Sequence, residues 1–316
     1  MNRHLTYIMF GTILLLVHFV FSVNLYVYAS DVPYIAFSSN RSGNYDIYMM
    51  DINGENLQQL TGYPGDEYHP TLSPDGLRMA YVSSRDGNLE IYVMNLATKV
   101  SHRLTNHVGR DYNPVWSPDG RWIAFESHRT GIRHIYKIKP DGSNLQQLTH
   151  ERNSNHHPAW SPDGKEIVFS SEGALWTITA NGRKLKQLAN RQQLASKPAW
   201  SPDGKKIAFT TTLLRNTDIY IMDADSGNVR RLTHHPAWDS SPVWGPNGHW
   251  IVFHSGWEEN YDIYVIDVAG TDRRRLTDHL ARDREPTWVP AGFFPVSPTV
   301  NTQATLWGRL KQSVHD

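Results

Sequence analysis

The 316-residue sequence predicts an all-β fold, a six-bladed β-propeller of four-stranded blades, because three short patterns return along it at one spacing. A Pro-x-Trp-Ser-Pro-Asp-Gly pattern, with small variations, begins six times at steps of 44, 44, 40, 44 and 44 residues. Its prolines are Pro70, Pro114, Pro158, Pro198, Pro242 and Pro286. An Asp-Ile-Tyr pattern that begins at Asp46 and a Leu-Thr pair that begins at Leu60 keep the same pitch. Short apolar runs at this repeat length, separated by turn signals, are typical of propeller blades.

Each repeat divides into four predicted strands joined by tight turns, as the third copy shows. Its second strand alternates apolar with small or polar side chains, as a strand with one buried face does. Pro118-Asp119-Gly120 and Asp141-Gly142 fit tight turns, in which glycine accepts a positive φ. From the channel outward, the predicted strands are Asn113–Ser117, Ile123–Ser127, His134–Lys139 and Leu145–Thr149. The single 40-residue step is explained by four residues missing from the loop between the second and third strands of the fourth copy.

The two ends of the repeat array indicate how the ring closes. The segment Ile35 to Ser39 matches the second strand of a repeat, so the chain up to Thr61 supplies only three strands. At the other end, Pro286 to Pro290 is a lone first strand, and the proline-rich stretch near residue 295 cannot continue a sheet. We therefore expect three N-terminal strands and one C-terminal strand to complete one blade within a propeller of residues 32–292. Such closure hides the sheet edges that would otherwise invite aggregation.

An uncharged apolar segment at the N-terminus predicts export. The segment Leu5 to Ser30 follows Arg3 and ends in small residues that favour cleavage after Ala29, which makes residues 1–29 a predicted signal peptide. The segment is also long enough to span a bilayer, so a retained membrane anchor is the alternative. In the C-terminal tail, residues 293–316, the spacing of apolar residues predicts a short amphipathic helix.

Composition excludes several classes of function. The 31 basic and 31 acidic residues balance, so no overall charge favours nucleic acid or an anionic membrane surface. Cysteine is absent, which excludes disulfides, thiolate catalysis and cysteine-ligated zinc. The sequence also has no Gly-x-Ser-x-Gly elbow, phosphate-binding loop or His-Glu-x-x-His pattern. It therefore lacks the motifs that would indicate a hydrolase, a nucleotide-binding protein or a zincin. We expect no catalytic residue, no bound metal and no cofactor.

The residues that repeat are predicted to be structural. An aspartate precedes glycine in the hairpin of most copies, where it favours local hydrogen bonds rather than a ring of reactive carboxylates. These aspartates are Asp75, Asp119, Asp163 and Asp203, and Asn247 takes their place in the fifth hairpin. The repeated tryptophans are predicted to pack between blades, because one aromatic at one structural position is usually core. They are Trp116, Trp160, Trp200, Trp244 and Trp288.

The residues that do not repeat are the candidates for binding. They lie just before each first strand, on loops that enter the central channel, where unlike polar and aromatic side chains form a predicted ligand surface. The predicted ligand-binding residues are Glu67, Tyr68, His69, Asp111, Tyr112, Asn113, His156, His157, Lys197, Asp239, Trp257, Arg284 and Glu285. A plainly solvated rim is the competing interpretation. Arginines on the neighbouring loops recur and are predicted to bond loop carbonyls, whereas Trp257 does not recur and is predicted to be an exposed aromatic anchor.

Histidines at this mouth raise the alternative of a metal site. The sequence has 16 histidines, and His69, His156 and His157 stand in the predicted ring near acidic residues. Some propeller lyases that act on oligogalacturonate use a histidine-rich metal site. Adjacent side chains on an extended strand point to opposite faces, however, which argues against His156 and His157 sharing an ion.

The combined patterns resemble the WD40-like (PD40) propeller repeat of the TolB family over about residues 33–292. The copy that begins at Pro198 carries every element in order, through Ile219-Tyr220 to Arg231-Leu232-Thr233. The resemblance implies an exported, periplasmic location and a propeller that binds a protein or a peptidoglycan-associated envelope component. Family members that act in the Tol-Pal system carry an α/β domain ahead of the propeller, whereas strand material here begins at about Val32. The expectation therefore covers fold, location and binding, and not the Tol-Pal role.

The sequence thus predicts a non-enzymatic, exported binding module for a protein or cell-envelope ligand. We expect a monomer that binds no nucleic acid and meets a membrane only through a retained N-terminal anchor. The alternative function is a metal-assisted polysaccharide lyase, of the oligogalacturonate type, that uses the histidine-bearing channel mouth.

Overall fold

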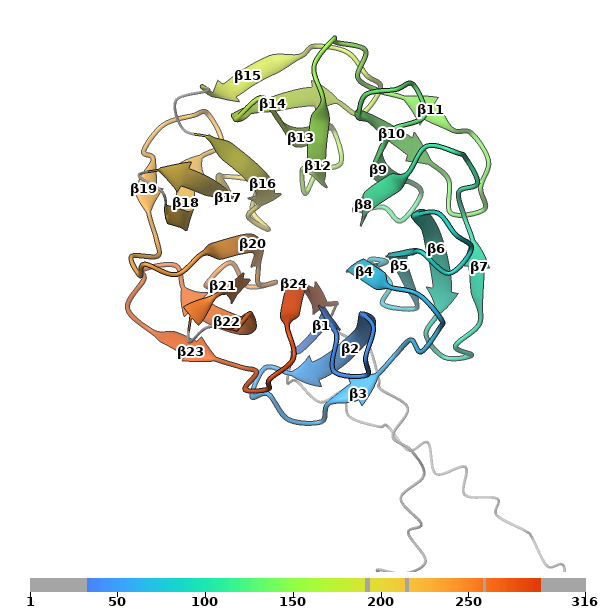
Figure 1. Cartoon of the computed structure of the whole chain (residues 1–316). Coiled ribbons are helices and arrows are strands. Elements are labelled where there is room, and N and C mark those ends of the chain that lie inside the picture. The colour runs from blue at the N-terminus through green and yellow to red at the C-terminus, as the bar shows by residue number, and fades with distance from the viewer. Residues whose placement is uncertain (1–32, 191–193, 214–215, 258–259, 291–316) are drawn as a thin grey trace, which may run out of the picture.

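The computed structural model describes residues 33–190, 194–213, 216–257 and 260–290 of the chain (Figure 1). These residues form six four-stranded sheets arranged around a central channel, with antiparallel pairing throughout. Within the described ranges, no helix is long and apolar enough to cross a membrane. The expected six-bladed, all-β propeller is confirmed.

The strands follow the repeat in order. The blade that holds both chain ends contains β1 (Tyr34–Ser39), β2 (Asp46–Asp51), β3 (Gln58–Gln59) and β24 (Asp283–Val289). The next two blades contain β4 (Glu67–Leu72), β5 (Arg78–Ser83), β6 (Glu90–Asn95) and β7 (Ser101–Arg103), then β8 (Asp111–Trp116), β9 (Ile123–Ser127), β10 (His134–Ile138) and β11 (Gln146–Gln147). The fourth contains β12 (Asn155–Trp160), β13 (Glu166–Ser171), β14 (Ala174–Thr179) and β15 (Lys186–Ala189). The last two contain β16 (Ala195–Trp200), β17 (Lys206–Leu213), β18 (Asn216–Asp223) and β19 (Arg230–Arg231), then β20 (Asp239–Trp244), β21 (Trp250–Ser255), β22 (Asp262–Asp267) and β23 (Arg273–Arg275).

The ring closes as the sequence predicts. Strand β24 lies innermost in the first blade and pairs with β1, in the order β24-β1-β2-β3. The pairing runs from Ser39 opposite Asp283 to Tyr34 opposite Val289. A bidentate ion pair reinforces it, because Arg41 Nη2 donates to both carboxylate oxygens of the buried Asp283 at 2.9 and 2.8 Å. The two ends of the repeat array therefore hold one another.

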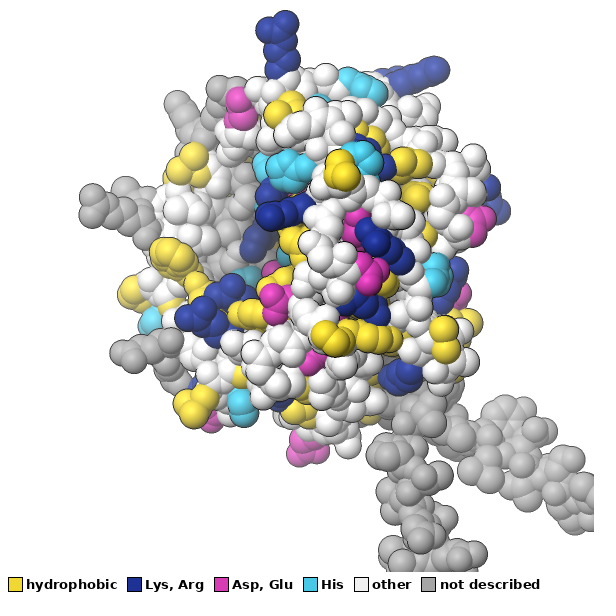
Figure 2. Space-filling view, turned by 45° about the vertical axis from the view of Figure 1, so that its right-hand side comes forward, with side chains coloured by type: hydrophobic (Ala, Val, Ile, Leu, Met, Phe, Trp, Pro, Cys, Tyr) yellow, Lys and Arg dark blue, Asp and Glu magenta, His cyan; other side chains and the backbone are white. Residues whose placement is uncertain are grey.

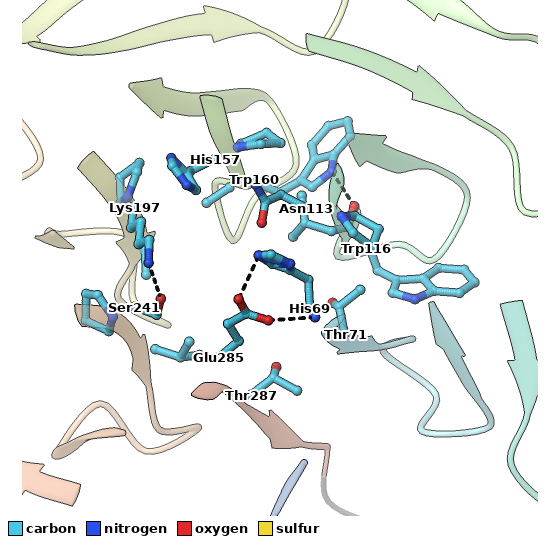
Figure 3. Close-up of a pocket in the computed structure, with 18 of the residues that line it drawn as sticks. His69, Thr71, Asn113, Trp116, His157, Trp160, Lys197, Ser241, Glu285 and Thr287 are labelled. Atoms are coloured by element: carbon cyan, nitrogen blue, oxygen red, sulfur yellow. Dashed lines mark hydrogen bonds and ion pairs between the residues drawn. The ribbon is translucent and has the colours of Figure 1, made fainter. Parts of the chain in front are cut away.

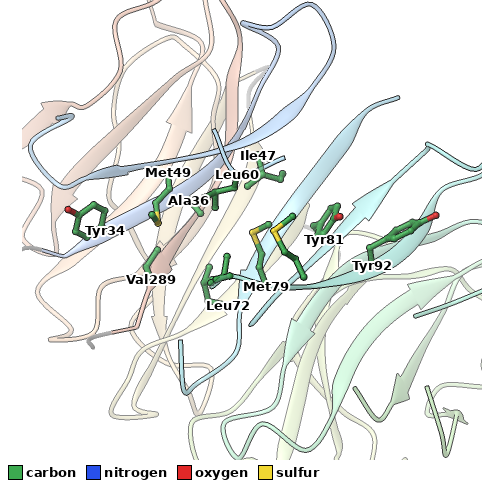
Figure 4. Packing of buried hydrophobic residues seen from close by; sticks show 12 residues of the cluster. Tyr34, Ala36, Ile47, Met49, Leu60, Leu72, Met79, Tyr81, Tyr92 and Val289 are labelled. Atoms are coloured by element: carbon green, nitrogen blue, oxygen red, sulfur yellow. The ribbon is translucent and has the colours of Figure 1, made fainter. Parts of the chain in front are cut away.

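The core consists of layers between neighbouring blades. One aromatic from the second strand of each blade is fully buried, and these are Phe37, Tyr81, Phe125, Phe169, Phe209 and Phe253. Figure 4 shows one such layer, in which Met49 and Val289 of the first blade pack beside Leu72 and Met79 of the next. The repeated tryptophans add hydrogen bonds across these layers, since Trp160, Trp244 and Trp288 donate their indole N–H to an inner-strand carbonyl of the preceding blade at 3.1 to 3.3 Å. The predicted packing role is confirmed.

The hairpin aspartates also have the predicted local role. Asp119 Oδ1 accepts hydrogen bonds from Ser117 Oγ at 2.6 Å and from the backbone N–H of Arg121 at 3.1 Å. Asp163 and Asp203 repeat this arrangement in the next two copies. These turns form the face of the ring opposite the loops that enter the channel, and we call that opposite side the turn face.

Candidate functional site at the channel mouth

Six inner-strand residues, one from each blade, form a polar ring inside the channel. Each precedes the repeated proline and has a left-handed backbone with φ between 48 and 57°: His69, Asn113, His157, Lys197, Ser241 and Glu285. The pairing register with the second strand shifts at this point in every blade, as it does between Tyr68 and Thr71. With the prolines and tryptophans below them, these side chains line a cavity of about 330 Å³ (Figure 3). We call the face from which the loops enter this cavity the mouth.

The inner strands begin two residues earlier than expected, and this places three predicted ligand residues inside the sheet. Glu67, Asp111 and Asp239 each open an inner strand and are fully buried, with 0% exposure. Asp111 accepts a hydrogen bond from Arg129 Nη2 at 2.9 Å, the same arrangement as Arg41 with Asp283. The recurring arginines are structural, as predicted, but Arg41 and Arg129 bind carboxylates rather than loop carbonyls.

Among the four blades whose inner strand opens with an acid, one has a tryptophan in place of this arginine. Trp257 occupies the arginine position beside Asp239, and burial raises the pKa of Asp239 to about 6 although the Ser255 and Thr233 hydroxyls lower it. Burial likewise raises the pKa of Glu67 to about 7, although the charge of Arg85, which lies over Tyr63 and Tyr92, lowers it. Burial also raises the pKa of Asp111 to about 6 in spite of its ion pair with Arg129, so removal of the carboxylate from water is the larger effect with or without the arginine.

Trp257 is stacked rather than free. Its ring lies 3.3 Å from that of His235 at an angle of 11°, and the Arg273 guanidinium lies 3.4 Å from its ring centroid. The exposed aromatic of this blade is Trp238, which is 58% exposed and was not among the predicted ligand residues. Its position directly before the inner strand, together with its failure to recur, is the sequence signal that could have identified it.

The remaining predicted residues line the upper wall of the mouth. Tyr68 packs against Tyr45 with ring centroids 5.0 Å apart, and the Arg133 guanidinium lies 4.9 Å from the Tyr112 ring. His156 Nδ1 lies 3.0 Å from a carboxylate oxygen of the buried Glu126, which is also bound by Arg133 at 3.6 Å and by Asn113. Arg284 lies over the ring of Tyr261 at 4.1 Å.

Charges inside the ring are unevenly paired. Glu285 accepts hydrogen bonds from the backbone N–H of His69 at 3.0 Å and from Ser38 Oγ at 3.2 Å, and its other oxygen lies 3.1 Å from His69 Nε2. Lys197 Nζ donates instead to two hydroxyls, Ser240 Oγ and Ser241 Oγ, each at 3.0 Å. In Figure 3 the contact between Lys197 and Ser241 lies at the left, and the contact between Glu285 and His69 lies near the middle of the view.

The histidines do not gather into a metal site in the described ranges. The bulge breaks the alternation expected of the strand, so the rings of His156 and His157 lie 5.9 Å apart instead of on opposite faces. His156 faces Glu126, whereas His157 Nδ1 lies 3.3 Å from Ser170 Oγ, and burial lowers the pKa of His157 to about 3. Among the residues that the structure describes, no group of three or more His, Cys, Asp or Glu side chains is placed to hold a metal ion.

Exposed hydrophobic side chains surround the mouth on the loops that enter it. Val108 is 95% exposed and Leu280 is 99% exposed, at equivalent positions of two loops, and Leu194 and Trp238 share another position. We call Val108, Leu194, Trp238 and Leu280 the apolar rim. In Figure 2 hydrophobic side chains alternate with basic and histidine side chains around the hollow of the ring. Exposed hydrophobic side chains that stand among polar and charged ones are usual on protein-binding faces.

Comparisons with known proteins identify the propeller. The family described as the TolB beta propeller domain matches residues 27–181, and the Tricorn protease N-terminal beta propeller domain matches residues 164–244. A protein named Protein TolB homolog from Chlorobaculum tepidum is 48% identical over 46 residues, and its namesake from Chlorobium chlorochromatii is 46% identical over 46 residues. Each match covers 15% of this chain and only 11% or 10% of the relative's length.

Solved structures agree on the fold. TolB from Acinetobacter baumannii aligns with a TM-score of 0.72 at 24% identity, over 82% of this chain and 67% of that one. A putative TolB from Agrobacterium tumefaciens aligns with a TM-score of 0.67 at 19% identity, over 84% of this chain and 99% of that one. An oligogalacturonate lyase in complex with manganese aligns less well, with a TM-score of 0.57 at 19% identity over 78% of this chain and 74% of that one. With its six blades, its repeated patterns and these matches, the chain forms a six-bladed β-propeller that is similar to the TolB beta propeller domain.

Proposed function

We propose that this protein is an exported, non-enzymatic binding module whose ligand, a protein or cell-envelope component, docks on the mouth. The observation that carries the proposal is the contrast between the two faces of the ring. On the turn face, hairpin sequences repeat and bond to themselves. On the mouth, side chains differ from blade to blade, an apolar rim lies on the entering loops, and a ring of polar side chains stands inside the channel.

Similarity to TolB propellers supports a binding role outside the cytoplasm. The structures titled TolB share this fold, the relatives named TolB homolog match one 46-residue segment, and the predicted signal peptide of residues 1–29 fits export. That segment and the predicted helix of the tail lie outside the described residues. Because the matched curated segments are a small part of their proteins, the proposal extends to binding and location, and not to a Tol-Pal assembly.

The alternative, a metal-assisted lyase, rests on the histidines and on a fold-level likeness to the manganese-bound oligogalacturonate lyase. Elemental analysis of the purified protein, dialysed against trace manganese and zinc, separates the two functions. Stoichiometric metal together with cleavage of oligogalacturonate would establish the lyase in place of the binding module.

The binding proposal is tested by comparing the two faces with matched hydrophobic substitutions. The mouth variant carries Val108→Ser, Trp238→Ser and Leu280→Ser. The turn-face control carries Leu77→Ser and Val100→Ser, which are 62% and 67% exposed in the parent. All of these side chains are solvent-exposed, so both variants should melt like the parent.

Each protein is immobilised and exposed to envelope extract from the native host, and bound components are quantified by mass spectrometry. We expect a component retained by the parent and by the control to fall at least about tenfold on the mouth variant, because buried aromatic and aliphatic anchors dominate interface energy. If the control loses the component and the mouth variant keeps it, the ligand surface lies on the turn face and the proposal is wrong.

A further inference from the structure

Two cations at the channel mouth have no carboxylate partner in the described part of the chain. Lys197 and Arg284 form no ion pair within 4.0 Å among those residues, whereas the two acids of this region, Glu285 and Glu126, are both engaged. The Nε of Arg284 is buried and has no hydrogen-bond partner there. Glu285 and Glu126 attract Lys197 only from beyond 4.0 Å, so neither cation has the contacting carboxylate that buried and partly buried charges normally have.

The charges of Lys197 and Arg284 both act on one buried side chain, His254. The side chain of His254 lies between β20 and β24, where its Nδ1 accepts the backbone N–H of Glu285 at 3.2 Å. Burial and the positive charges of Lys197 and Arg284 together lower the pKa of His254 well below its ordinary value. A neutral histidine here can accept or donate hydrogen bonds but adds no further charge.

The ammonium group of Lys197 is held in place and has a proton left for a further hydrogen-bond acceptor. Two of its three ammonium protons are held by the hydroxyls of Ser240 and Ser241, which fix the head group inside the cavity and leave the third proton for another partner. Burial lowers the pKa of Lys197, and that cost is reversed when an anion approaches the ammonium group. On its own strand, the cavity wall that follows Lys197 consists of Pro198, Ala199 and Trp200, which offer the ammonium group no side-chain acceptor.

We propose that Lys197, supported by Ser240, Ser241 and Arg284, forms a carboxylate-binding subsite that receives an acidic side chain or chain terminus of a protein ligand. This inference rests on the proposed binding function and specifies what the ligand must carry. The apolar rim favours a protein as the source of the carboxylate, because exposed valine, leucine and tryptophan side chains complement a protein surface better than a hydrated sugar acid.

The test uses a pair of small probes that differ in one group. The peptide acetyl-Gly-Asp-Gly-amide carries a carboxylate, and acetyl-Gly-Asn-Gly-amide is its neutral counterpart of similar shape. Binding is followed at low ionic strength by NMR of ¹³C-methylated lysines, with the Lys197 signal assigned by its loss in Lys197→Met. We expect the aspartate peptide to shift the Lys197 signal and to raise the pKa measured for that lysine, and the asparagine peptide to bind about tenfold more weakly.

Variants separate the subsite from general effects on folding. Lys197→Met should weaken the aspartate peptide about tenfold, and Lys197→Arg should retain most of the binding. Lys137→Met is the matched control, since Lys137 is a buried lysine beside the turn face, where its Nζ donates to the Ala180 carbonyl at 2.7 Å and lies 4.2 Å from the Trp122 ring centroid. Equal binding of the two peptides, or an unchanged affinity in Lys197→Met, would overturn the subsite.

Digalacturonate serves as a third probe. If digalacturonate binds through Lys197 and the aspartate peptide does not, the carboxylate belongs to a sugar acid and the assignment to a protein is wrong. The two proposals fail separately. If the mouth variant no longer captures the envelope component but Lys197 does not respond to the peptide, the subsite alone is wrong. If Lys197 responds to the peptide but the mouth variant captures as the parent does, the proposed docking face alone is wrong.

Discussion

Replacement of Arg41 by methionine should destabilise the whole propeller, because Arg41 is the guanidinium that joins the two ends of the repeat array. It donates two hydrogen bonds to Asp283, whose carboxylate has 0% exposure, and a third to Ser39 Oγ at 2.8 Å. Removing one partner of a buried ion pair leaves an uncompensated charge and costs about 3–5 kcal/mol. For a domain of this size the melting temperature should fall by roughly 6 °C or more.

Urea denaturation followed by tryptophan fluorescence measures the effect. Arg121→Met is the surface control, since Arg121 and Asp119 are 3.9 Å apart with side chains 81% and 55% exposed, and it should cost less than about 1 kcal/mol. The double variant Arg41→Met with Asp283→Leu should recover most of the loss, because no charge then remains buried. If Arg41→Met alone unfolds within about 1 kcal/mol of the parent, the ion pair does not hold the ring closed and the reasoning fails.

Three further predictions concern other parts of the chain. Asp239→Asn should stabilise the protein at pH 8 and change little at pH 4, because the folded-state pKa of about 6 lies above the ordinary value and the carboxylate therefore costs stability as the pH rises from about 4 to 6. The gain at pH 8, measured by urea denaturation, should reach about 2–3 kcal/mol, and an equal gain at both pH values would show that charge is not the cause. A chain that ends at Arg282 loses β24 and should show no cooperative melt and should self-associate on gel filtration through the exposed β1 edge, whereas deletion of residues 305–316 should be mild. Intact mass of protein recovered from the native host should show Ser30 as the first residue, and a full-length species that requires detergent would establish the anchor instead.

Repetition makes the fold predictable from the sequence. Six copies of one pattern average out local ambiguity, so the strands, the hairpins and the closure by β24 all follow from the spacing of the repeats. The short loop of the fourth blade is also predicted correctly, since β13 ends at Ser171 and β14 begins at Ala174.

The site is less predictable because it depends on a backbone feature without a sequence signal. The residue before each repeated proline is left-handed, yet five of the six are neither glycine nor asparagine, the residues that usually mark this conformation. This bulge displaces the side-chain alternation and brings His156 close to His157, while the earlier start of the inner strands buries Glu67 and Asp239. The sequence shows that Trp257 replaces an arginine, but only the structure shows that this position lies beside the buried carboxylate of Asp239.

The way in which the ring is closed also orients the molecule. Strand β1 enters at Tyr34 and β24 leaves beside it at Val289, both at the turn face, while Ser39 and Asp283 meet at the mouth. Anything covalently attached before Tyr34 or after Val289 is therefore fastened to the side away from the channel opening. If the chain is linked at either point to a support, a membrane or a fused domain, the mouth faces away from the attachment. The apolar rim then stays accessible to a partner.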